Sequence, residues 1–282
     1  MRQTDPAARI LQSEDIVRLE EFARQIRVHV LRMVAGAKSG HPGGPLGMAD
    51  YMAYLFSDFL RLDPQNPTWE DRDRFILSNG HTCAGYYAAM ALRGYFPESE
   101  LATFRQLGSR LQGHPSPLYM PWLENAGGSL GQGLSFAVGS ALAARTLKKS
   151  WRVVAAISDG ESQEGMTWEA AMAAAHYKLG NLIACVDRNN IQIDGRTDDI
   201  MSVEPYLDKW LGFGWAVMEA DGHDFEQIDL AFRWADGIKD RPAIIVFRTI
   251  LGKGVSFMEN NPDFHGKAPN AAEVEIALKE LE

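Results

Sequence analysis

Short apolar runs alternate along this chain with longer segments in which apolar residues recur at helical spacing. The runs bounded by turn residues are typical of buried parallel strands, and they cover residues 74–77, 152–157, 182–186, 214–219 and 243–249. Helices are expected over 14–37, 46–60, from Ala84 onward, over 98–109, up to about Lys148, over 164–179 and 224–238, and at the C-terminal end. This alternation predicts an α/β fold, a doubly wound parallel sheet with helices on both faces. No repeat or linker interrupts the pattern, so we expect one domain over residues 1–282.

Two polar residues follow neighbouring strands of this predicted sheet. Asp159 opens the turn after the run 152–157, and Asn189 follows the run 182–186. A strand, a crossover helix and a second parallel strand form a right-handed unit, so both residues are expected at the same sheet edge. Either residue alone would be an ordinary turn residue, but the pair favours a ligand site. A carboxylate and an amide oxygen suit Mg²⁺ or Ca²⁺, with the other positions filled by a backbone carbonyl, water and phosphate oxygens.

Glycine- and proline-rich loops carry several histidines. Four of them share this loop chemistry, which indicates one common site at the sheet edge: His41, His81, His114 and His265. Capping or loop hydrogen bonding is the expected role of His29, His176 and His223. The segment 39–45 holds too many glycines and prolines for the interior of an element, so we expect a shaped loop there. The glycine-rich turn 127–133 opens a helix and suits a phosphate group.

Length, charge and cysteine content narrow the classes of function. The chain has 282 residues, enough for one large domain with a substantial core. Its net charge is −9, from 28 Lys and Arg against 37 Asp and Glu, and it has no basic run, which argues against nucleic acid and acidic membrane surfaces as partners. Residues 1–15 are polar and no stretch approaches the ~20 apolar residues of a membrane span, so a cytoplasmic protein is expected. Cys83 and Cys185 are expected to be reduced packing thiols.

Seven ordered stretches of this sequence resemble the N-terminal, diphosphate-binding part of transketolases. They are AKSGHPGGPLGMAD (37–50), SNGH (78–81), GHP (113–115), GGSLGQG (127–133), DGESQEG (159–165), KLGNLIACVDRNNIQIDG (178–195) and FHGKAP (264–269). The DG turn followed about thirty residues later by Asn also looks like the thiamine diphosphate signature. The resemblance covers roughly residues 15–270, and it implies a domain that binds thiamine diphosphate through a divalent metal.

The resemblance implies roles for individual residues. The implied cofactor-binding set is His81, Gly128, Ser129, Leu130, Gly160, Glu161, Asn189 and Ile193. The implied metal ligands, for Mg²⁺ with Ca²⁺ or Mn²⁺ as alternatives, are Asp159, Asn189 and the carbonyl of Ile191. The implied catalytic groups, which would hydrogen-bond the sugar and steady its developing oxyanion, are His41, His114 and His265. Acidic residues at the family's subunit interface are matched by Glu164 and Glu169.

The chain departs from the family in two ways. Ser158 stands where the family usually has Gly, and its side chain reduces the space beside the diphosphate. In the family, a second domain supplies the glutamate that activates the cofactor and the cations that hold the sugar phosphate, and nothing after residue 270 resembles that domain. We therefore hypothesise a split transketolase, in which a homodimer core of this N-terminal subunit joins a separate C-terminal subunit in a heterotetramer. Exposed apolar surface for this docking is expected along 164–179 and 37–60.

Three alternatives share parts of this pattern: the alpha subunit of a 2-oxo acid dehydrogenase, a deoxyxylulose-phosphate-synthase-like enzyme, and a non-catalytic thiamine-diphosphate-binding module. The stretches at 41–45 and 264–269 favour transketolase over the first, and the stretch at 178–195 favours it over the second. The sequence leaves the sugar open among pentose phosphates, a branched or sulfonated sugar, and a free ketose.

Overall fold

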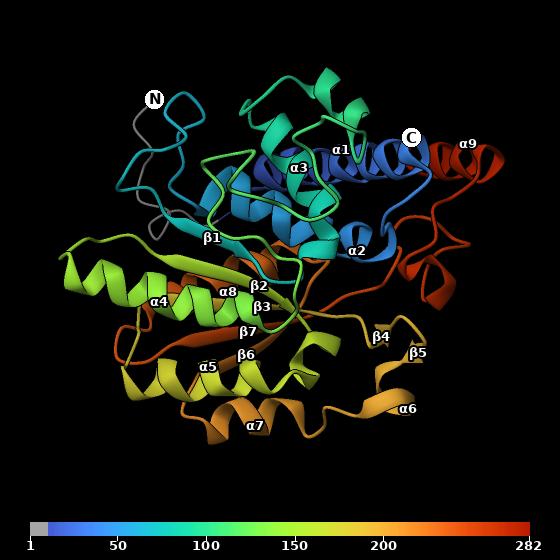
Figure 1. Ribbon diagram of the computed structural model, residues 1–282. Helices are drawn as coiled ribbons and strands as arrows, with labels where there is room; N and C mark the ends of the chain where they lie inside the picture. Colours follow the sequence, from blue (N-terminus) through green and yellow to red (C-terminus); the bar gives the residue numbers. More distant parts are fainter. Residues whose placement is uncertain (1–10) are drawn as a thin grey trace.

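A five-stranded parallel sheet with helices on both faces forms the centre of the molecule (Figure 1). The computed structural model describes residues 11–282, so residues 1–10 of the expected domain and of its polar N-terminal segment lie outside the described residues. The sheet has the order β1-β2-β3-β7-β6. Its strands are β1 (Arg74–Leu77), β2 (Val153–Ser158), β3 (Leu182–Arg188), β6 (Ala216–Asp221) and β7 (Ala243–Arg248). The predicted fold class is confirmed.

The helices pack around this sheet, and a small hairpin lies outside it. The α-helices are α1 (Ser13–Ala37), α2 (Gly43–Tyr54), α3 (Cys83–Leu92), α4 (Gln132–Thr146), α5 (Gly165–His176), α6 (Thr197–Met201), α7 (Tyr206–Gly212), α8 (Phe225–Gly237) and α9 (Ala271–Glu280). A π-helical turn covers Leu55–Phe59, and 3₁₀ helices cover Gly80–Thr82, Glu98–Thr103, Gly160–Gln163 and Pro262–His265. The hairpin pairs β4 (Ile191–Gln192) with β5 (Gly195–Arg196) in antiparallel fashion. Within residues 11–282, no helix combines the length and apolar character needed to cross a bilayer.

One hydrophobic core packs against each face of the sheet. Alternate strand residues such as Val154 and Cys185 pack with α1, α2, α3 and α8 on one face. The intervening residues, such as Ala155 and Val186, pack with α4, α5 and α7 on the other. Because both faces are covered, the central strands are apolar throughout rather than alternating. Cys83 and Cys185 are free and buried, as expected.

The register of the sheet brings together the two turns that carry Asp159 and Asn189. In the parallel pairing of β2 with β3, Ser158 lies opposite Asp187. Asp159 follows the first of these residues directly, and Asn189 lies two positions after the second. The two turns therefore leave the sheet side by side at its carboxyl edge, as the strand-helix-strand pattern predicts.

Two local predictions were wrong. The expected helix over 98–109 is only a 3₁₀ helix, Glu98–Thr103, because Arg105 and Gly108 adopt positive φ angles of 58° and 81° that end regular helix. The expected loop 39–45 is partly helical, since α2 begins at Gly43. Its glycines allow contact with a neighbouring segment, because a Cβ at Gly43 would lie 2.8 Å from the carbonyl oxygen of Phe264.

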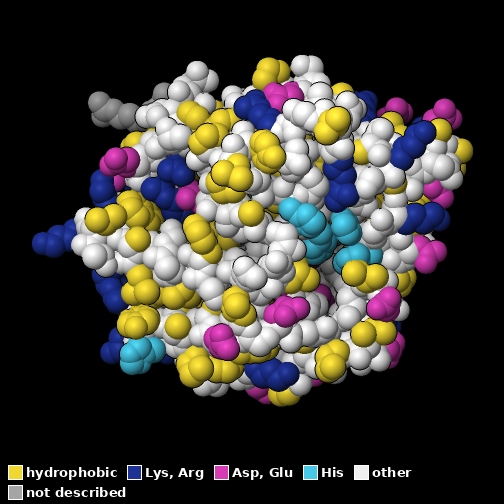
Figure 2. Space-filling view, viewed as in Figure 1, with side chains coloured by type: hydrophobic (Ala, Val, Ile, Leu, Met, Phe, Trp, Pro, Cys, Tyr) yellow, Lys and Arg dark blue, Asp and Glu magenta, His cyan; other side chains and the backbone are white. Residues whose placement is uncertain are grey.

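The prediction of exposed apolar surface was half wrong. Every residue of α2 is buried, because this helix packs against α1, α3 and α8 inside one core, so the segment 37–60 offers little apolar surface. The neighbouring helices α4 and α5 do expose large apolar side chains, namely Phe136, Met166 and Met172, and the C-cap residue of α4, Leu147, is also exposed. Figure 2 shows apolar atoms spread over the face on which these two helices lie.

Two glycines fix the distance between the loop after β1 and the loop before α4. The backbone N–H of Gly80 donates a hydrogen bond to the carbonyl oxygen of Gly127 at 3.0 Å. A Cβ on Gly127 would lie 2.3 Å from the carbonyl oxygen of Leu77 and 2.7 Å from the Cα atom of Gly80. Only glycine fits here, because rigid backbone rather than a movable side chain lies on the other side.

We expect Gly127→Ala to lower the free energy of unfolding by at least ~2 kcal/mol, because the methyl group forces the two loops apart. Gly139→Ala on α4 is the matched control, since a Cβ there meets no atom within 4 Å. That change should raise stability by up to ~1 kcal/mol through helix propensity. Urea denaturation of both variants measures the difference, and equal stability of the two would contradict the close-approach explanation.

Candidate active site

A pocket of about 430 Å³ opens at the carboxyl edge of the sheet. It brings together side chains from the ends of β2 and β3, the hairpin, and the loops that precede α2, α3 and α4. His41, His81, His114 and His265 all line it. In the space-filling view, histidine side chains gather at one place on this face of the molecule (Figure 2). The four histidines that share a loop chemistry in the sequence thus lie in one cavity.

Asp159 is a buried carboxylate held by backbone groups. It is 1% exposed, and its two oxygens accept hydrogen bonds from the N–H groups of Gly160 at 2.7 Å and Asn190 at 2.6 Å. Burial raises the pKa of Asp159 to about 6, although these backbone bonds act in the opposite direction. The positive charge of Arg188 also favours the ionised form of Asp159, but it does not outweigh the effect of burial on the pKa.

Asn189 lies beside Asp159 in a fixed orientation. Its amide nitrogen donates to Asp187 at 2.8 Å, and its amide oxygen accepts from the N–H of Ile191 at 2.9 Å. Asp187 also accepts a short hydrogen bond from the hydroxyl of Thr249, and it is 1% exposed. Burial raises the pKa of Asp187 to about 7, and the neighbouring Asp159 adds to this effect.

This donor set fits a hard divalent cation. Asp159 and Asp187 are both buried, and the charge of Asp159 raises the pKa of Asp187. A cation between the two strand ends would therefore offset the free-energy cost of burying two negative charges side by side. An amide or carboxylate oxygen has a second lone pair after one hydrogen bond, which leaves it able to bind a metal. Within the described part of the chain, no cluster of three or more His, Cys, Asp or Glu side chains has metal-binding geometry. The fit therefore rests on the mixed set of carboxylate, amide and backbone carbonyl oxygens.

Three of the pocket histidines form a close cluster. The ring centres of His41 and His81 lie 5.2 Å apart, those of His41 and His265 5.7 Å, and those of His81 and His265 5.3 Å. His114 is more exposed and lies against the loop of Gly128. The Nδ1 atoms of His41 and His265 are buried and have no hydrogen-bond partner among the residues the structure describes.

These histidines are neutral near neutral pH. Burial lowers the pKa of His41 to about 4 and that of His81 to about 3, and nearby imidazoles and Arg105 strengthen the shift at His41. Burial also lowers the pKa of His114 and of His265. Neutral imidazole can donate one proton and accept another, which suits proton exchange with hydroxyl groups.

The remaining histidines have structural contacts. His223 accepts from the N–H of Ile250 through Nε2 at 2.9 Å, so its Nδ1 carries the proton shared with Asp50 at 2.7 Å. His29 pairs with Glu98 at 3.1 Å, and the ring of His176 lies against Tyr177. None of these three lines the pocket.

The residues implied as cofactor contacts border the pocket in different ways. Gly128 and Leu130 line it, and Ser129 lies between them in the same turn. Gly160 lines it beside Asp159, and Ile193 presents a side chain that is 73% exposed. Glu161 also borders the pocket, but it is 0% exposed and both of its carboxylate oxygens bond to protein groups. Ser158 also lines the pocket, next to the turn.

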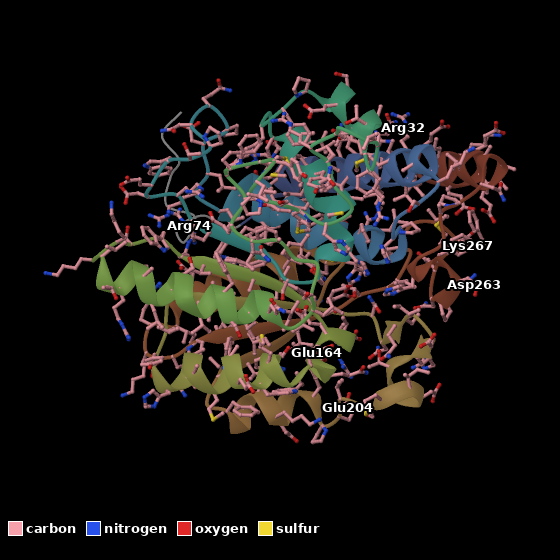
Figure 3. The ribbon with its side chains drawn as sticks, viewed as in Figure 1. Arg32, Arg74, Glu164, Glu204, Asp263 and Lys267 are labelled. Carbon is pink, nitrogen blue, oxygen red and sulfur yellow. The ribbon has the colours of Figure 1, made fainter. Side chains whose placement is uncertain are left out.

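Glu164 and Glu169 lie at the exposed side of α5. Glu164 is the N-cap residue of this helix, and it also borders the pocket. Figure 3 shows its side chain at the start of α5, close to the ends of the strands. Glu169 is exposed on the same helix. Both therefore lie where a molecule covering the face of α4 and α5 would meet them.

Several site residues were missed by sequence reasoning. Asp187 follows an apolar run and looks in the sequence like part of the turn, yet it is buried between Asn189 and Thr249. Gln163 and Gln192 also line the pocket, and the amide nitrogen of Gln163 donates to Gln192 at 2.6 Å and to the carbonyl of Met201 at 2.7 Å. An acid at the end of a buried strand, two residues before an expected metal ligand, was the signal available for Asp187.

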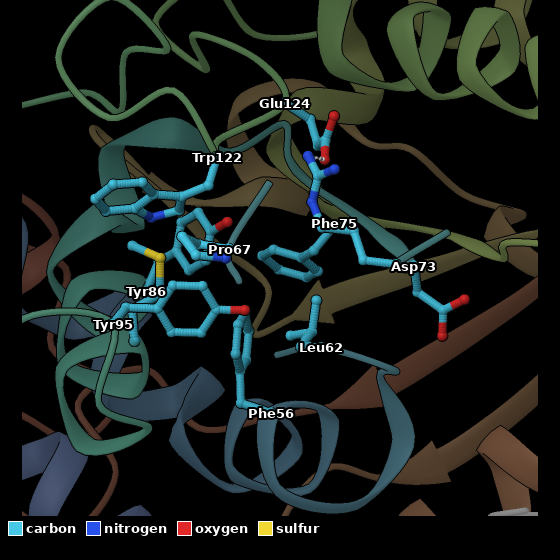
Figure 4. Close-up of a pocket in the computed structure, with 11 residues that line it drawn as sticks. Phe56, Leu62, Pro67, Asp73, Phe75, Tyr86, Tyr95, Trp122 and Glu124 are labelled. Carbon is cyan, nitrogen blue, oxygen red and sulfur yellow. Dashed lines mark hydrogen bonds and ion pairs between the residues drawn. The ribbon is translucent and has the colours of Figure 1, made fainter. Parts of the chain in front are cut away.

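A second cavity is far smaller and lies in an aromatic part of the core. It has a volume of about 20 Å³ and is bordered by side chains such as Phe56, Phe75 and Tyr86 (Figure 4). The ion pair of Arg72 with Glu124 closes one side. This volume holds about one water molecule, so the cavity is a packing gap rather than a ligand site.

The fold and the pocket define an α/β domain with a cavity at the carboxyl edge of a parallel sheet, which is where folds of this class bind ligands. The sequence model described as "Transketolase, thiamine diphosphate binding domain" matches residues 19–281. The chain is 38% identical over 263 residues to an apulose-4-phosphate transketolase subunit of Phocaeicola vulgatus, covering 93% of each chain. It is 40% identical over 270 residues to 6-deoxy-6-sulfo-D-fructose transketolase subunit SqwG of a Clostridium species, covering 96% of this chain and 98% of that one.

A solved structure agrees with these relatives. Transketolase from Leishmania mexicana superposes with a TM-score of 0.89 at 35% identity, over 93% of this chain and 41% of that chain. The chain thus spans less than half the length of this single-chain transketolase. The chain belongs to the transketolase thiamine diphosphate binding domain family, which confirms the family predicted from its motifs.

We expect acid to destabilise the protein through its pocket histidines. The unfolded state takes up a proton on each histidine near pH 6.5, whereas folded His41 and His81 stay neutral down to about pH 4 and about pH 3. The contribution of these two histidines to the free energy of unfolding should therefore fall as pH drops below 6.5, by up to ~1.4 kcal/mol per pH unit for each histidine. Urea denaturation between pH 7.5 and pH 5 measures this slope.

The double variant His41→Asn/His81→Asn should lose much of this pH dependence. The buried carboxyl groups of Asp159, Glu161 and Asp187 have raised pKa values and act with the opposite sign, but both proteins share them. The difference between the two slopes therefore isolates the histidines. Identical slopes would show that these imidazoles titrate normally in the folded protein.

Proposed function

We propose that this chain is the N-terminal subunit of a two-chain transketolase, which transfers a two-carbon ketol unit from a ketose donor to an aldose acceptor. The observation that carries the proposal is the convergence of four histidines and the amide of Asn189 in one pocket, beside the buried carboxylates of Asp159 and Asp187. Membership of the family and the near-complete coverage of relatives named as transketolase subunits support it.

The turns after β2 and β3 would hold the cofactor's diphosphate. Asp159, the amide oxygen of Asn189 and the carbonyl of Ile191 are the proposed ligands of Mg²⁺, with Ca²⁺ or Mn²⁺ as substitutes. The backbone at Gly160 and at Gly128 to Leu130 would approach the cofactor closely, while the exposed side chain of Ile193 would cover its rings. When bound, thiamine diphosphate supplies the carbon nucleophile for breaking and forming the C–C bond.

The pocket histidines would manage protons and hold the sugar. His41, His114 and His265 are the proposed catalytic groups, because neutral imidazoles donate to a developing alkoxide and exchange protons with hydroxyl groups. His41 and His265 both line the pocket, with ring centres 5.7 Å apart, which supports a joint role for these two side chains. His81, whose ring lies close to both, is proposed to contact the cofactor.

A partner chain is part of the proposal. The relatives named as subunits have the length of this chain, whereas the single-chain transketolase is more than twice as long. We infer that a separate C-terminal subunit supplies the glutamate that activates the cofactor and the cations that hold the sugar phosphate. The exposed apolar face of α4 and α5, with Glu164 and Glu169 upon it, is the proposed contact between two copies of this chain. The two relatives are named for different ketoses, so we assign the substrate only as a ketose or ketose phosphate.

The isolated chain should catalyse no ketol transfer, and activity should return when the companion subunit is added. Product formation from a panel of ketose phosphates and aldehyde acceptors measures this, with each chain alone as the control. The apparent rate should saturate as the companion chain is titrated in. Turnover by the isolated chain at the rate of the mixture would refute the split.

Asp159→Asn should weaken Mg²⁺-dependent binding of thiamine diphosphate by about 100-fold, because one anionic ligand of the metal is lost. Asp194→Asn is the matched control, since Asp194 also lines the pocket and loses the same charge, but it is exposed and outside the proposed ligand set. The control should change affinity less than about threefold, as for one screened charge. Calorimetric titration with and without Mg²⁺ measures both, and equal losses would argue against Asp159 as a ligand.

A further inference from the structure

Glu161 is a buried acid that joins three separate segments of the pocket wall. One carboxylate oxygen, Oε1, accepts a hydrogen bond from the N–H of Gly131 at 2.7 Å and a short one from the hydroxyl of Ser78. Ser78 follows β1, Gly131 is the N-cap of α4, and Glu161 itself follows β2. One side chain therefore connects the ends of two strands with the start of a helix.

The second oxygen of Glu161 completes a reciprocal contact with Ser158. Oε2 accepts from the N–H of Ser158 at 3.2 Å, while the hydroxyl of Ser158 accepts from the N–H of Glu161 at 3.3 Å. A serine followed three positions later by a glutamate, bonded in both directions, is the arrangement of a capping box. Here it closes the turn that contains Asp159 and Gly160. The side chain at Ser158, where the family usually has Gly, is thus engaged by the turn itself.

Gly131 ties this unit to the turn 128–130. Its φ angle is +79°, a left-handed conformation that favours glycine, and the turn comes directly before it in the chain. Its N–H would otherwise be an unpaired donor at a buried position. Glu161 supplies that acceptor, so the position of the turn depends on a side chain from the segment that follows β2.

We propose that Ser158 and Glu161 act together as positioning residues, which set the distance between the Asp159-Gly160 turn and the 128–130 turn before any ligand arrives. The cofactor part of this proposal rests on the proposed function, because both turns would face thiamine diphosphate. Glu161 acts through these turns rather than by touching the ligand, since its side chain has no exposed surface. A site held in advance loses less free energy on binding than one that must be ordered by its ligand.

Three variants distinguish the hydrogen bonds that Glu161 makes from others in the same turn. Glu161→Ala removes both oxygens. Glu161→Gln retains one carbonyl oxygen that can accept from Gly131 and Ser78. An amide nitrogen replaces the second carboxylate oxygen, and it cannot accept a hydrogen bond from the N–H of Ser158. Ser162→Ala is the matched control: its hydroxyl is buried in the same 3₁₀ turn and bonds to the carbonyl of Ser158 and to Tyr206, without any link to Gly131.

Amide hydrogen exchange of the full chain without cofactor tests the positioning directly. In Glu161→Ala, exchange in the peptide covering 127–133 should accelerate by about tenfold or more, because the Gly131 amide has lost its acceptor. Glu161→Gln should keep this peptide protected, and Ser162→Ala should leave it unchanged. Unchanged exchange at 127–133 in Glu161→Ala, or the same acceleration in Ser162→Ala, would overturn the proposal. Thermal unfolding confirms that each variant is folded at the temperature used.

Calorimetric titration with thiamine diphosphate and Mg²⁺, in the presence of the companion subunit, tests the consequence for binding. Glu161→Ala should raise the Kd of the cofactor about tenfold, Glu161→Gln less, and Ser162→Ala less than about twofold. An equal loss of cofactor affinity in Glu161→Ala and Ser162→Ala would mean that both variants act by general destabilisation, and it would overturn the positioning role of Glu161. If the unsubstituted protein takes up no cofactor, the proposed function fails, and the exchange experiment alone decides whether Ser158 and Glu161 hold the two turns.

Discussion

The parallel pairing of β2 with β3 is the constraint on which the site depends. It places Ser158 opposite Asp187, so that three acidic side chains, Asp159, Glu161 and Asp187, are enclosed at one sheet edge. A buried carboxylate is costly unless hydrogen bonds or a counter-charge support it. Backbone N–H groups support Asp159, a hydroxyl and an amide support Asp187, and three donors support Glu161. The shapes of the surrounding turns follow from these requirements.

Much of the fold could be predicted from local pattern. The apolar runs located the five sheet strands, because strands covered on both faces stand out as continuous apolar segments. The strand-helix-strand order then placed Asp159 and Asn189 at the same edge without any knowledge of their side-chain contacts. The histidine loops could be gathered at that edge for the same reason. Topology was thus sufficient for the general location of the site.

The details that were missed depend on contacts between distant segments. Nothing near Glu161 in the sequence indicates that Gly131 and Ser78 will supply donors, so its burial could not be read from local pattern. The glycines at the start of α2 favoured a loop by propensity, but close packing against the segment around Phe264 overrides that preference. The helix expected over 98–109 failed because side-chain spacing alone does not reveal a positive φ angle at Arg105.

Glu164 borders the pocket, and it is also the N-cap of α5, the helix whose exposed side carries Met166 and Met172. A molecule that covers this helix would change the surroundings of the pocket rim in the same event. Coupling of this kind is reciprocal, so filling the pocket would alter the affinity for the covering molecule by the same factor. Where the covering molecule favours ligand binding, dilution of the protein releases the ligand, and excess ligand holds the assembly together.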